Sequence, residues 1–307
     1  MSRRGLNLVD DHVSALREAV STALASLTAD LPWLSSELTT RLLRNDDLRI
    51  ARERLFAVIA AAAMGGRPVQ GLPVATISTL WWSGVDDDGL PNAALLTLHH
   101  ISTIRASKER RTGWMEDVLK STNSALEASI ATKTRHAGEF SRQAVLSDHL
   151  GLHGGAYARD AAMTARICAP RTVEPWRRFG MLYGLLRRTT LDHRSSTVDE
   201  DGNPALIVPD LLMAHACARA APAAKVELAR LRSEASLHPY TRATLRDLLR
   251  SPHVVAAYRT DLRSLHHRAH AQLDELEPVS PYGELLRSTL DEALETGVPS
   301  AREVVGL

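Results

Sequence analysis

The sequence has little cysteine, few aromatic residues and almost no pattern typical of β-strands. Its two cysteines, Cys168 and Cys217, are too few for a disulfide framework or a zinc site, so we expect a reducing compartment, the cytoplasm. Alternating runs of β-branched and aromatic residues do not occur, whereas Ala, Leu, Arg and Glu dominate. The composition therefore predicts an all-α protein.

Long apolar segments and a strong charge of one sign are also absent. The longest apolar run, around residues 55–64, is too short to cross a bilayer, and the first ten residues lack the apolar stretch of a signal peptide. A formal net charge of +1 over 307 residues gives no general attraction to nucleic acid or to an acidic surface. We therefore expect a soluble protein that neither spans a membrane nor binds nucleic acid.

What the sequence does contain is helical periodicity along nearly its whole length. Apolar residues recur at three- and four-residue steps, and Gly and Pro mark the ends of the periodic segments. No internal repeat and no long linker divides them, so we expect a single all-helical domain over residues 1–307. The expected helices cover residues 13–27, 41–63, 73–84, 92–104, 115–132, 140–150, 156–167, 179 onward, 209–221, 224–235, 240–249, 254–276 and 284–295, with a basic turn at residues 108–111.

The segment from residue 179 to residue 209 combines an apolar helix face with a row of polar side chains. If the helix continues far enough, spacings of four, three and four residues place this row on one face: Arg188, Asp192, Ser195 and Asp199. The turn-forming sequence Asp-Gly-Asn-Pro at residues 201–204 then ends the helix. Such a row suits either a ligand at a helix end or a solvated helix face.

Residues 179–193, FGMLYGLLRRTTLDH, resemble the second signature of the trans-isoprenyl diphosphate synthases, a Phe-Gly helix that carries Gln and then an Asp-Asp-x-x-Asp cluster. Residues 202–209 similarly resemble the Gly-Lys-x-x-x-x-Pro turn of that family, and the order of helices matches from about residue 41 onward. The resemblance implies an isoprenoid-synthase-like helical bundle around a central cavity. It also implies a prenyl diphosphate substrate, Mg²⁺, and a homodimer or a heterodimer with a related prenyl synthase.

The chemistry of that family begins with ionisation of an allylic diphosphate, whose leaving group is stabilised by Mg²⁺ and by Arg or Lys. Mg²⁺ prefers carboxylate and phosphate oxygens, which is why the family carries two facing Asp clusters. The resemblance places the first cluster on residues 83–87, where Asp87 is retained and Asp86 offers a neighbouring carboxylate. A charged helix end in solvent is the alternative interpretation of these acids.

The second cluster of the resemblance falls on residues 191–195, where Asp192 is the retained carboxylate. Terpene synthases carry Asn-Asp-x-x-Ser-x-x-x-Glu at the matching place. Asp192, Ser195 and Asp199 fit that pattern, whereas Leu191 replaces its Asn; chance similarity in a polar helix end is the alternative. The resemblance implies Asp87 and Asp192 as catalytic residues and a metal site formed by Asp86, Asp87, Asp192, Ser195 and Asp199.

The resemblance also assigns residues that bind the substrate. Arg188 stands at the Gln position, and Arg187 beside it could contact the diphosphate, although a solvated helix face explains both as well. Arg49 is the surviving cation of the isopentenyl diphosphate site, and His153 replaces the Lys of Lys-Thr-Gly-Ala. Trp82 could face a carbocation through a cation–π contact, or it could belong to the core.

Two functions from different classes are compatible with these residues. Ordinary chain elongation is not expected, because Asp46 and His153 occupy Lys positions of the family and its Arg-Arg-Gly loop is missing after residue 88. The first hypothesis is a divergent terpene synthase or prenyl transferase that ionises a prenyl diphosphate. The second is a non-catalytic partner subunit that pairs with an active prenyl synthase and sets its product length.

Two histidines outside these motifs, His266 and His270, are four residues apart on an expected helix. This spacing places both rings on one helix face, where they could bind a metal ion. The sequence places no third ligand beside them, so surface or partly buried histidine is the simpler interpretation.

Overall fold

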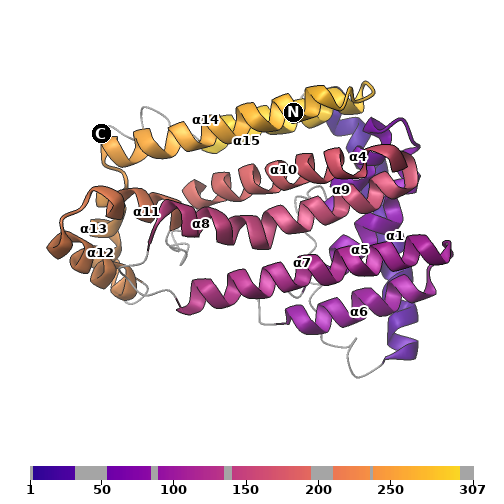
Figure 1. The fold of residues 1–307 in the computed structure, drawn as a ribbon, viewed down its shortest axis with the longest axis horizontal. Coiled ribbons are helices and arrows are strands. Elements are labelled where there is room, and N and C mark those ends of the chain that lie inside the picture. The colour runs from indigo at the N-terminus through magenta and orange to yellow at the C-terminus, as the bar shows by residue number, and fades with distance from the viewer. Residues whose placement is uncertain are drawn as a thin grey trace.

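The computed structural model describes residues 3–31, 54–83, 89–134, 140–194, 210–235 and 238–297. Within these ranges every regular element is a helix and no strand occurs, which confirms the predicted fold class (Figure 1). The 3₁₀ helices are η1 (Pro68–Gly71) and η3 (Pro170–Thr172), and η2 (Leu150–Gly154) is a π-helix. The α-helices are α1 (Arg3–Asp30), α4 (Phe56–Ala63), α5 (Leu72–Trp82), α6 (Leu90–Thr103), α7 (Lys108–Thr134), α8 (Arg142–His149), α9 (Gly155–Cys168), α10 (Val173–Arg194), α11 (Asp210–Arg219), α12 (Pro222–Glu234), α13 (Pro239–Leu249), α14 (Pro252–Glu275) and α15 (Tyr282–Gly297).

The long helices lie side by side across the molecule, with α10 near the middle of the stack (Figure 1). α10 packs against α9 and also against α14 and α15, while α9 in turn packs against α7. The short helices α11, α12 and α13 gather at one end of the stack, and α1 and α4 lie at the other end. α10 therefore connects the two ends of the bundle through its centre.

Local sequence signals explain most of the helix boundaries. Proline occupies the first turn of α5, where its missing N–H costs no hydrogen bond. Gly65 ends the α4 segment with a φ of +82°, the left-handed conformation that glycine adopts at low cost. The predicted basic turn at residues 108–111 is wrong: these residues form the first turn of α7. Ser107 caps that turn, since its hydroxyl accepts a hydrogen bond from the backbone N–H of Arg110 at 3.3 Å.

Two glycines let α10 approach α9 at backbone distance. A Cβ atom at Gly180 would overlap the carbonyl oxygen of Tyr157, and one at Gly184 would lie 2.6 Å from the carbonyl oxygen of His153. Because the two glycines are four residues apart, they lie on the same face of α10. The close approach sets the position of His153 relative to the C-terminal half of α10.

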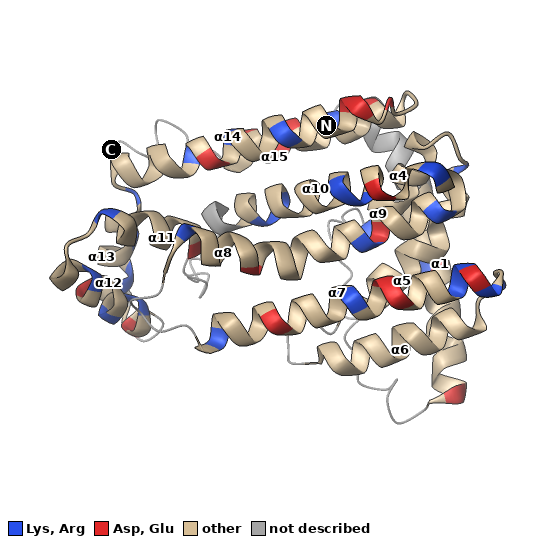
Figure 2. Ribbon diagram, viewed as in Figure 1, with Lys and Arg blue, Asp and Glu red and all other residues tan. Residues whose placement is uncertain are grey.

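The core between α4, α9 and α10 contains a cluster of aromatic rings. Phe56 contacts Tyr157 edge-on, with ring centroids 5.2 Å apart, and lies 4.8 Å from Tyr183. Such pairs add stability beyond the apolar area that they bury. Lys, Arg, Asp and Glu are mixed along the helices, and much of α9 carries no charged residue (Figure 2). None of the described helices combines the length and apolarity that a membrane-spanning segment requires.

Candidate functional site

A cavity of about 260 Å³ lies where α7, α8, α10 and the beginning of α11 meet. Leu90 and Pro91 of α6 form part of its apolar wall. Asp210 is held by Arg232, with 2.8 Å between Oδ1 and Nη2, so its negative charge is already paired. Cationic and protonatable side chains predominate in the lining, which makes the cavity suitable for an anion. Its ionisable lining residues are Lys133, Asp148, His149, His153, Arg188 and Asp210.

Two of the lining residues, His149 and His153, lie on a rare backbone element. His149 is the last residue of α8, and His153 belongs to the π-helical turn η2 that joins α8 to α9. The backbone stays in helical conformations through Gly154, so α8, η2 and α9 form one nearly continuous helix. π-helical turns of this kind often occur at functional sites.

The electrostatic surroundings of His153 keep its imidazole neutral. Burial lowers the pKa of His153 well below the ordinary value of 6.5. The positive charges of Arg188 and Arg54, together with His149, lower this pKa further. At neutral pH His153 therefore offers a hydrogen-bonding imidazole, and the arginines supply the positive charge.

His153 and its neighbours Arg54, His149 and Arg188 form a basic cluster. Trp82, at the end of α5, joins this cluster to the core. Its ring is buried and lies 5.2 Å from the ring of His153, measured between centroids. The guanidinium carbon of Arg54 lies 4.7 Å from the Trp82 ring centroid, a cation–π contact. The indole thus contacts the Arg54 guanidinium and packs against His153, which lines the cavity.

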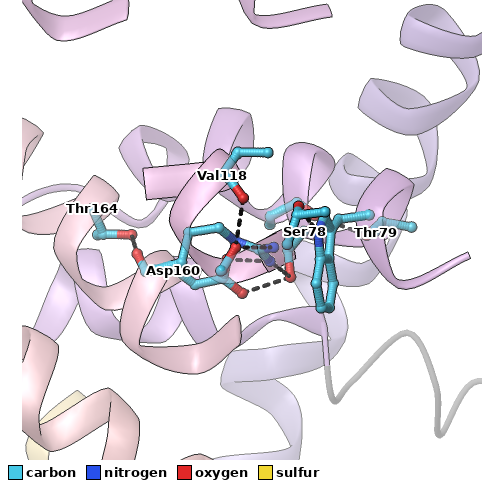
Figure 3. Close-up of polar contacts among 10 residues, drawn as sticks. Ser78, Thr79, Val118, Asp160 and Thr164 are labelled. Atoms are coloured by element: carbon cyan, nitrogen blue, oxygen red, sulfur yellow. Dashed lines mark hydrogen bonds and ion pairs between the residues drawn. The ribbon is translucent and has the colours of Figure 1, made fainter. Parts of the chain in front are cut away.

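A buried polar network holds α5 against α9 and α7 behind this cluster (Figure 3). The Ser78 hydroxyl donates to Asp160 Oδ2 at 2.6 Å, and Arg159 Nε donates to Asp160 Oδ1 at 2.8 Å. Trp81 donates its indole N–H to the Thr122 hydroxyl at 2.9 Å. Buried ion pairs of this kind have few alternative arrangements, because separating the partners leaves an unpaired charge in the core. The network therefore fixes α5, and with it Trp82, relative to α9.

A larger groove of about 470 Å³ adjoins this cavity along α7 and the α8–η2–α9 segment, and the two share Ala128 and Asp148. Two of its charged groups, Arg177 and Asp117, are bound to each other. Arg177 Nη2 lies 2.8 Å from Asp117 Oδ1, and Arg166, beside the groove, donates to Asp117 Oδ2 at 3.1 Å. None of the site residues predicted from the sequence is among the groove's lining residues, so the smaller cavity is the stronger candidate.

Comparison with solved structures identifies the fold. A geranylgeranyl pyrophosphate synthetase from Pyrococcus horikoshii Ot3 matches with a TM-score of 0.76 and 14% identity, over 94% of this chain and 99% of that one. A polyprenyl synthetase from Streptomyces coelicolor A3(2) matches with a TM-score of 0.72 and 13% identity, over 93% and 99% of the two chains. The chain has the trans-isoprenyl diphosphate synthase fold.

A third synthase of this fold was solved with ligands. It is a geranylgeranyl pyrophosphate synthase from Corynebacterium glutamicum complexed with calcium and isoprenyl diphosphate, with a TM-score of 0.72 and 15% identity over 97% of this chain and 99% of that one. No protein-family profile and no curated protein sequence matches the chain. The resemblance stated from short motifs is thus confirmed at the level of the isoprenoid synthase fold.

Within this fold the structure brings three of the predicted site residues together. Trp82 ends α5, the helix that precedes the first acidic segment, and Arg188 lies near the end of α10, the helix that carries the second. Arg188 and His153 line the same cavity, and Trp82 packs on His153. Arg187 belongs to α10 as well, but it is not among the cavity-lining residues, and its contact with a substrate stays a prediction.

The other predicted residues cannot be placed in the site. Arg49, Asp86, Asp87, Ser195 and Asp199 lie outside the described residues. Asp192 belongs to the last turn of α10, four residues after Arg188, but its side chain is not among those described. The roles given to these six residues therefore stay predictions.

The donor chemistry of the predicted metal set suits Mg²⁺. Its members are four carboxylates and one hydroxyl, the hard oxygen ligands that this ion prefers. The backbone bounds are compatible with such a set: α5 ends at Trp82, a few residues before Asp86, and α10 reaches Asp192. Arg188 of α10 lines the cavity directly, whereas Trp82, the last residue of α5, reaches it only through its contact with His153.

Sequence reasoning missed two residues of the basic cluster, Arg54 and His149. His149 precedes His153 by four residues, and this helical spacing is a signal that could have found it. Arg54 has no such signal, because its contact with Trp82 joins segments 28 residues apart and depends on how the stretch before α4 packs against α5.

Proposed function

We propose that this chain binds a prenyl diphosphate in the cavity lined by His153 and Arg188, and acts in isoprenoid biosynthesis as a divergent terpene synthase or prenyl transferase. One observation carries the proposal. Arg188 of α10, the helix that carries one acidic segment, lines a cavity rich in cationic side chains, and Trp82, the last residue of α5, packs on His153 of the same cavity. A synthase of the same fold was solved with isoprenyl diphosphate and calcium, which supports this class of ligand.

The described residues can bind and orient the diphosphate. Arg188 and Lys133 line the cavity and would donate charge-assisted hydrogen bonds to phosphate oxygens. His153, neutral before binding, would donate a hydrogen bond, and a bound anion would raise the pKa of its imidazole. Arg188 and Lys133 would thus fix the leaving group at the polar end of the site.

The reaction would break the allylic C–O bond, so that the diphosphate leaves with the bonding electron pair and an allylic carbocation remains. A bound Mg²⁺ supplies charge stabilisation for that leaving group, and Asp86, Asp87, Asp192, Ser195 and Asp199 are the residues that would hold it. The Trp82 indole packs on His153 and would border the carbocation only with the ring face that Arg54 leaves open.

The test is incubation of the purified full-length protein with geranyl, farnesyl and geranylgeranyl diphosphates and Mg²⁺, with and without isopentenyl diphosphate. Released diphosphate and organic products are measured. We expect turnover of one allylic diphosphate alone, and no chain elongation, because the isopentenyl site has lost Lys positions. Elongation by the homogeneous protein would contradict this expectation.

A non-catalytic partner subunit is the second candidate, and exposed apolar side chains on α6 and α7 favour it. Leu95 on α6 and Leu119 and Ile130 on α7 are 57%, 48% and 61% exposed, and the two helices pack side by side, so these side chains suit an interaction surface. If no prenyl diphosphate is turned over, but the protein changes the product length of a synthase that co-purifies with it, this second candidate is correct.

A further inference from the structure

Two histidines and one aspartate form a cluster between the last two helices, away from the cavity described above. His266 and His270 lie on one face of α14, and Asp291 lies on α15. His266 Nε2 is 2.9 Å from Asp291 Oδ1, and His270 Nε2 is 3.0 Å from the same oxygen. The three potential ligand atoms all lie within 4.8 Å of one another. Asp291 is therefore the third ligand that the sequence alone did not place.

We infer that this cluster is a binding site for a divalent transition-metal ion of the zinc class, which links α14 to α15. Imidazole nitrogens with one carboxylate suit zinc and its neighbours, whereas Mg²⁺ and Ca²⁺ prefer oxygen ligands alone. Ligand bonds of about 2.0–2.1 Å in a tetrahedral site put neighbouring ligand atoms roughly 3.3 Å apart. The nitrogen–oxygen separations in the cluster need only a small expansion to admit an ion.

The packing beneath the cluster holds its ligands in place. Leu265, Ala269 and Leu290 are buried, and each directly precedes one of the three ligands in the sequence. They belong to the hydrophobic core between the packed helices α14 and α15. Ligands on two packed helices lose little freedom when an ion binds, which favours binding. Asp291 is more than half exposed, so water can complete the coordination of the ion.

The cation one turn before Asp291 on α15 already has a partner. Arg287, one turn before Asp291 on α15, donates to Asp274 Oδ1 from Nη2 at 2.8 Å and from Nε at 3.2 Å. Asp274 lies one turn after His270 on α14, so this ion pair also links α14 to α15, one helical turn away from the cluster. The cation nearest in sequence to Asp291 on α15 is thus bound to its own partner.

The expected role of the ion is to fasten the C-terminal helix to the bundle. α15 packs on α10, and the carbonyl oxygen of Ala293 accepts a hydrogen bond from the Thr190 hydroxyl at 3.0 Å. Asp291 is two residues before Ala293, so an ion at the cluster would steady the helix that supports the end of α10.

The experiment is a calorimetric titration of the full-length protein with ZnCl₂ in excess MgCl₂, which occupies oxygen-only sites. We expect one Zn²⁺ per chain, a higher melting temperature with Zn²⁺, and a visible Co²⁺ spectrum typical of four-coordinate nitrogen and oxygen ligands. His270→Gln should weaken Zn²⁺ binding at least about tenfold, because even outer-shell changes cost about 10–100-fold. Circular dichroism checks that the variant folds.

The matched control is His267→Gln, which removes the exposed neighbour on the same helix and should leave Zn²⁺ affinity unchanged. Equal Zn²⁺ affinity in the wild-type protein and in His270→Gln would overturn the inference. So would equal weakening by His267→Gln, or the absence of saturable Zn²⁺ binding by the wild-type protein. Zn²⁺ affinity is measured independently of the prenyl diphosphate cavity, whose described lining includes no residue of α14 or α15.

Discussion

At the scale of single residues, His153 shows how its surroundings decide what a side chain can contribute. The family places a Lys at this position, and sequence comparison alone suggests that His153 replaces its charge. Burial and the neighbouring Arg188, Arg54 and His149 instead lower the pKa of the imidazole. Around His153 the positive charge therefore lies on the arginines, one of which, Arg54, was not predicted.

The lowered pKa of His153 predicts a loss of stability in mild acid. The unfolded chain binds a proton at this histidine below about pH 6.5, whereas the folded protein does not until a much lower pH. The free energy of unfolding therefore falls as pH falls below about 6.5, with a contribution from His153 of at most about 1.4 kcal/mol per pH unit. Urea unfolding of the wild-type protein and His153→Gln, at about pH 7.5 and about pH 5.5, measures the contribution of His153 to the unfolding free energy.

The variant removes this titration and leaves the other twelve histidines in place. Its unfolding free energy should decline less steeply between the two pH values than that of the wild-type protein. If both proteins decline in parallel, His153 is protonated in the folded state and its assigned environment is wrong.

At the scale of helices, the α9–α10 contact is the one on which the site most depends. Gly180→Ala should destabilise the protein by about 1–3 kcal/mol, since the added methyl overlaps the Tyr157 carbonyl oxygen and lies 2.8 Å from the Cβ of Ala161. Thermal and urea unfolding measure the change.

Gly155→Ala is the matched control on the neighbouring helix. Gly155 has a helical φ of −61°, and its Cβ would find its nearest neighbour at 3.6 Å, an ordinary contact. Alanine there should stabilise the protein by about 0.5–1 kcal/mol. A Gly180→Ala variant as stable as Gly155→Ala would show that α10 and α9 are further apart than described.

Most helices could be predicted from the sequence, because apolar periodicity and Gly or Pro stops are local signals. The expected helix at 254–276, for example, is α14 with its ends moved by one or two residues. Local signals that were overlooked account for the wrong turn at residues 108–111, where Ser107 caps α7. The earlier start of α10, at Val173 instead of Phe179, has the same origin, because Pro175 lies in its first turn, where proline is tolerated.

The partners within each site could not be predicted in this way. Arg54 meets Trp82 across 28 residues, and Asp291 meets His266 and His270 across 25 and 21 residues. Such pairs depend on which helices pack together, and helical periodicity contains no information about that. The π-helical turn that carries His153 has no clear sequence signature either.

At the scale of the whole molecule, we propose a single domain, because one hydrophobic cluster includes residues from Val13 of α1 to Ala293 of α15. We also expect the chain to form dimers through α6 and α7. Leu119 and Ile130 are exposed and eleven residues apart, a spacing that returns to the same helix face. Light scattering after size exclusion should give twice the mass of one chain.

The double variant Leu119→Glu, Ile130→Glu should give the mass of one chain with unchanged helicity, because charges at an apolar interface are costly to bury. Val226→Glu is the control, since Val226 is 72% exposed on α12, away from that face. A wild-type protein that elutes as a monomer would indicate instead that this surface binds a different partner chain.

The central claim is that a prenyl diphosphate binds at the cavity lined by Arg188. Calorimetric titration with geranyl, farnesyl and geranylgeranyl diphosphates in Mg²⁺ tests it most directly, with Arg188→Gln and, as a control, Arg178→Gln from an exposed position on the same helix. We predict saturable binding of at least one ligand by the wild-type protein and by Arg178→Gln. Arg188→Gln should bind it about 10–100-fold more weakly, the cost of one charge-assisted hydrogen bond. No binding of any of the three ligands, or equal affinity in Arg188→Gln, would contradict the claim.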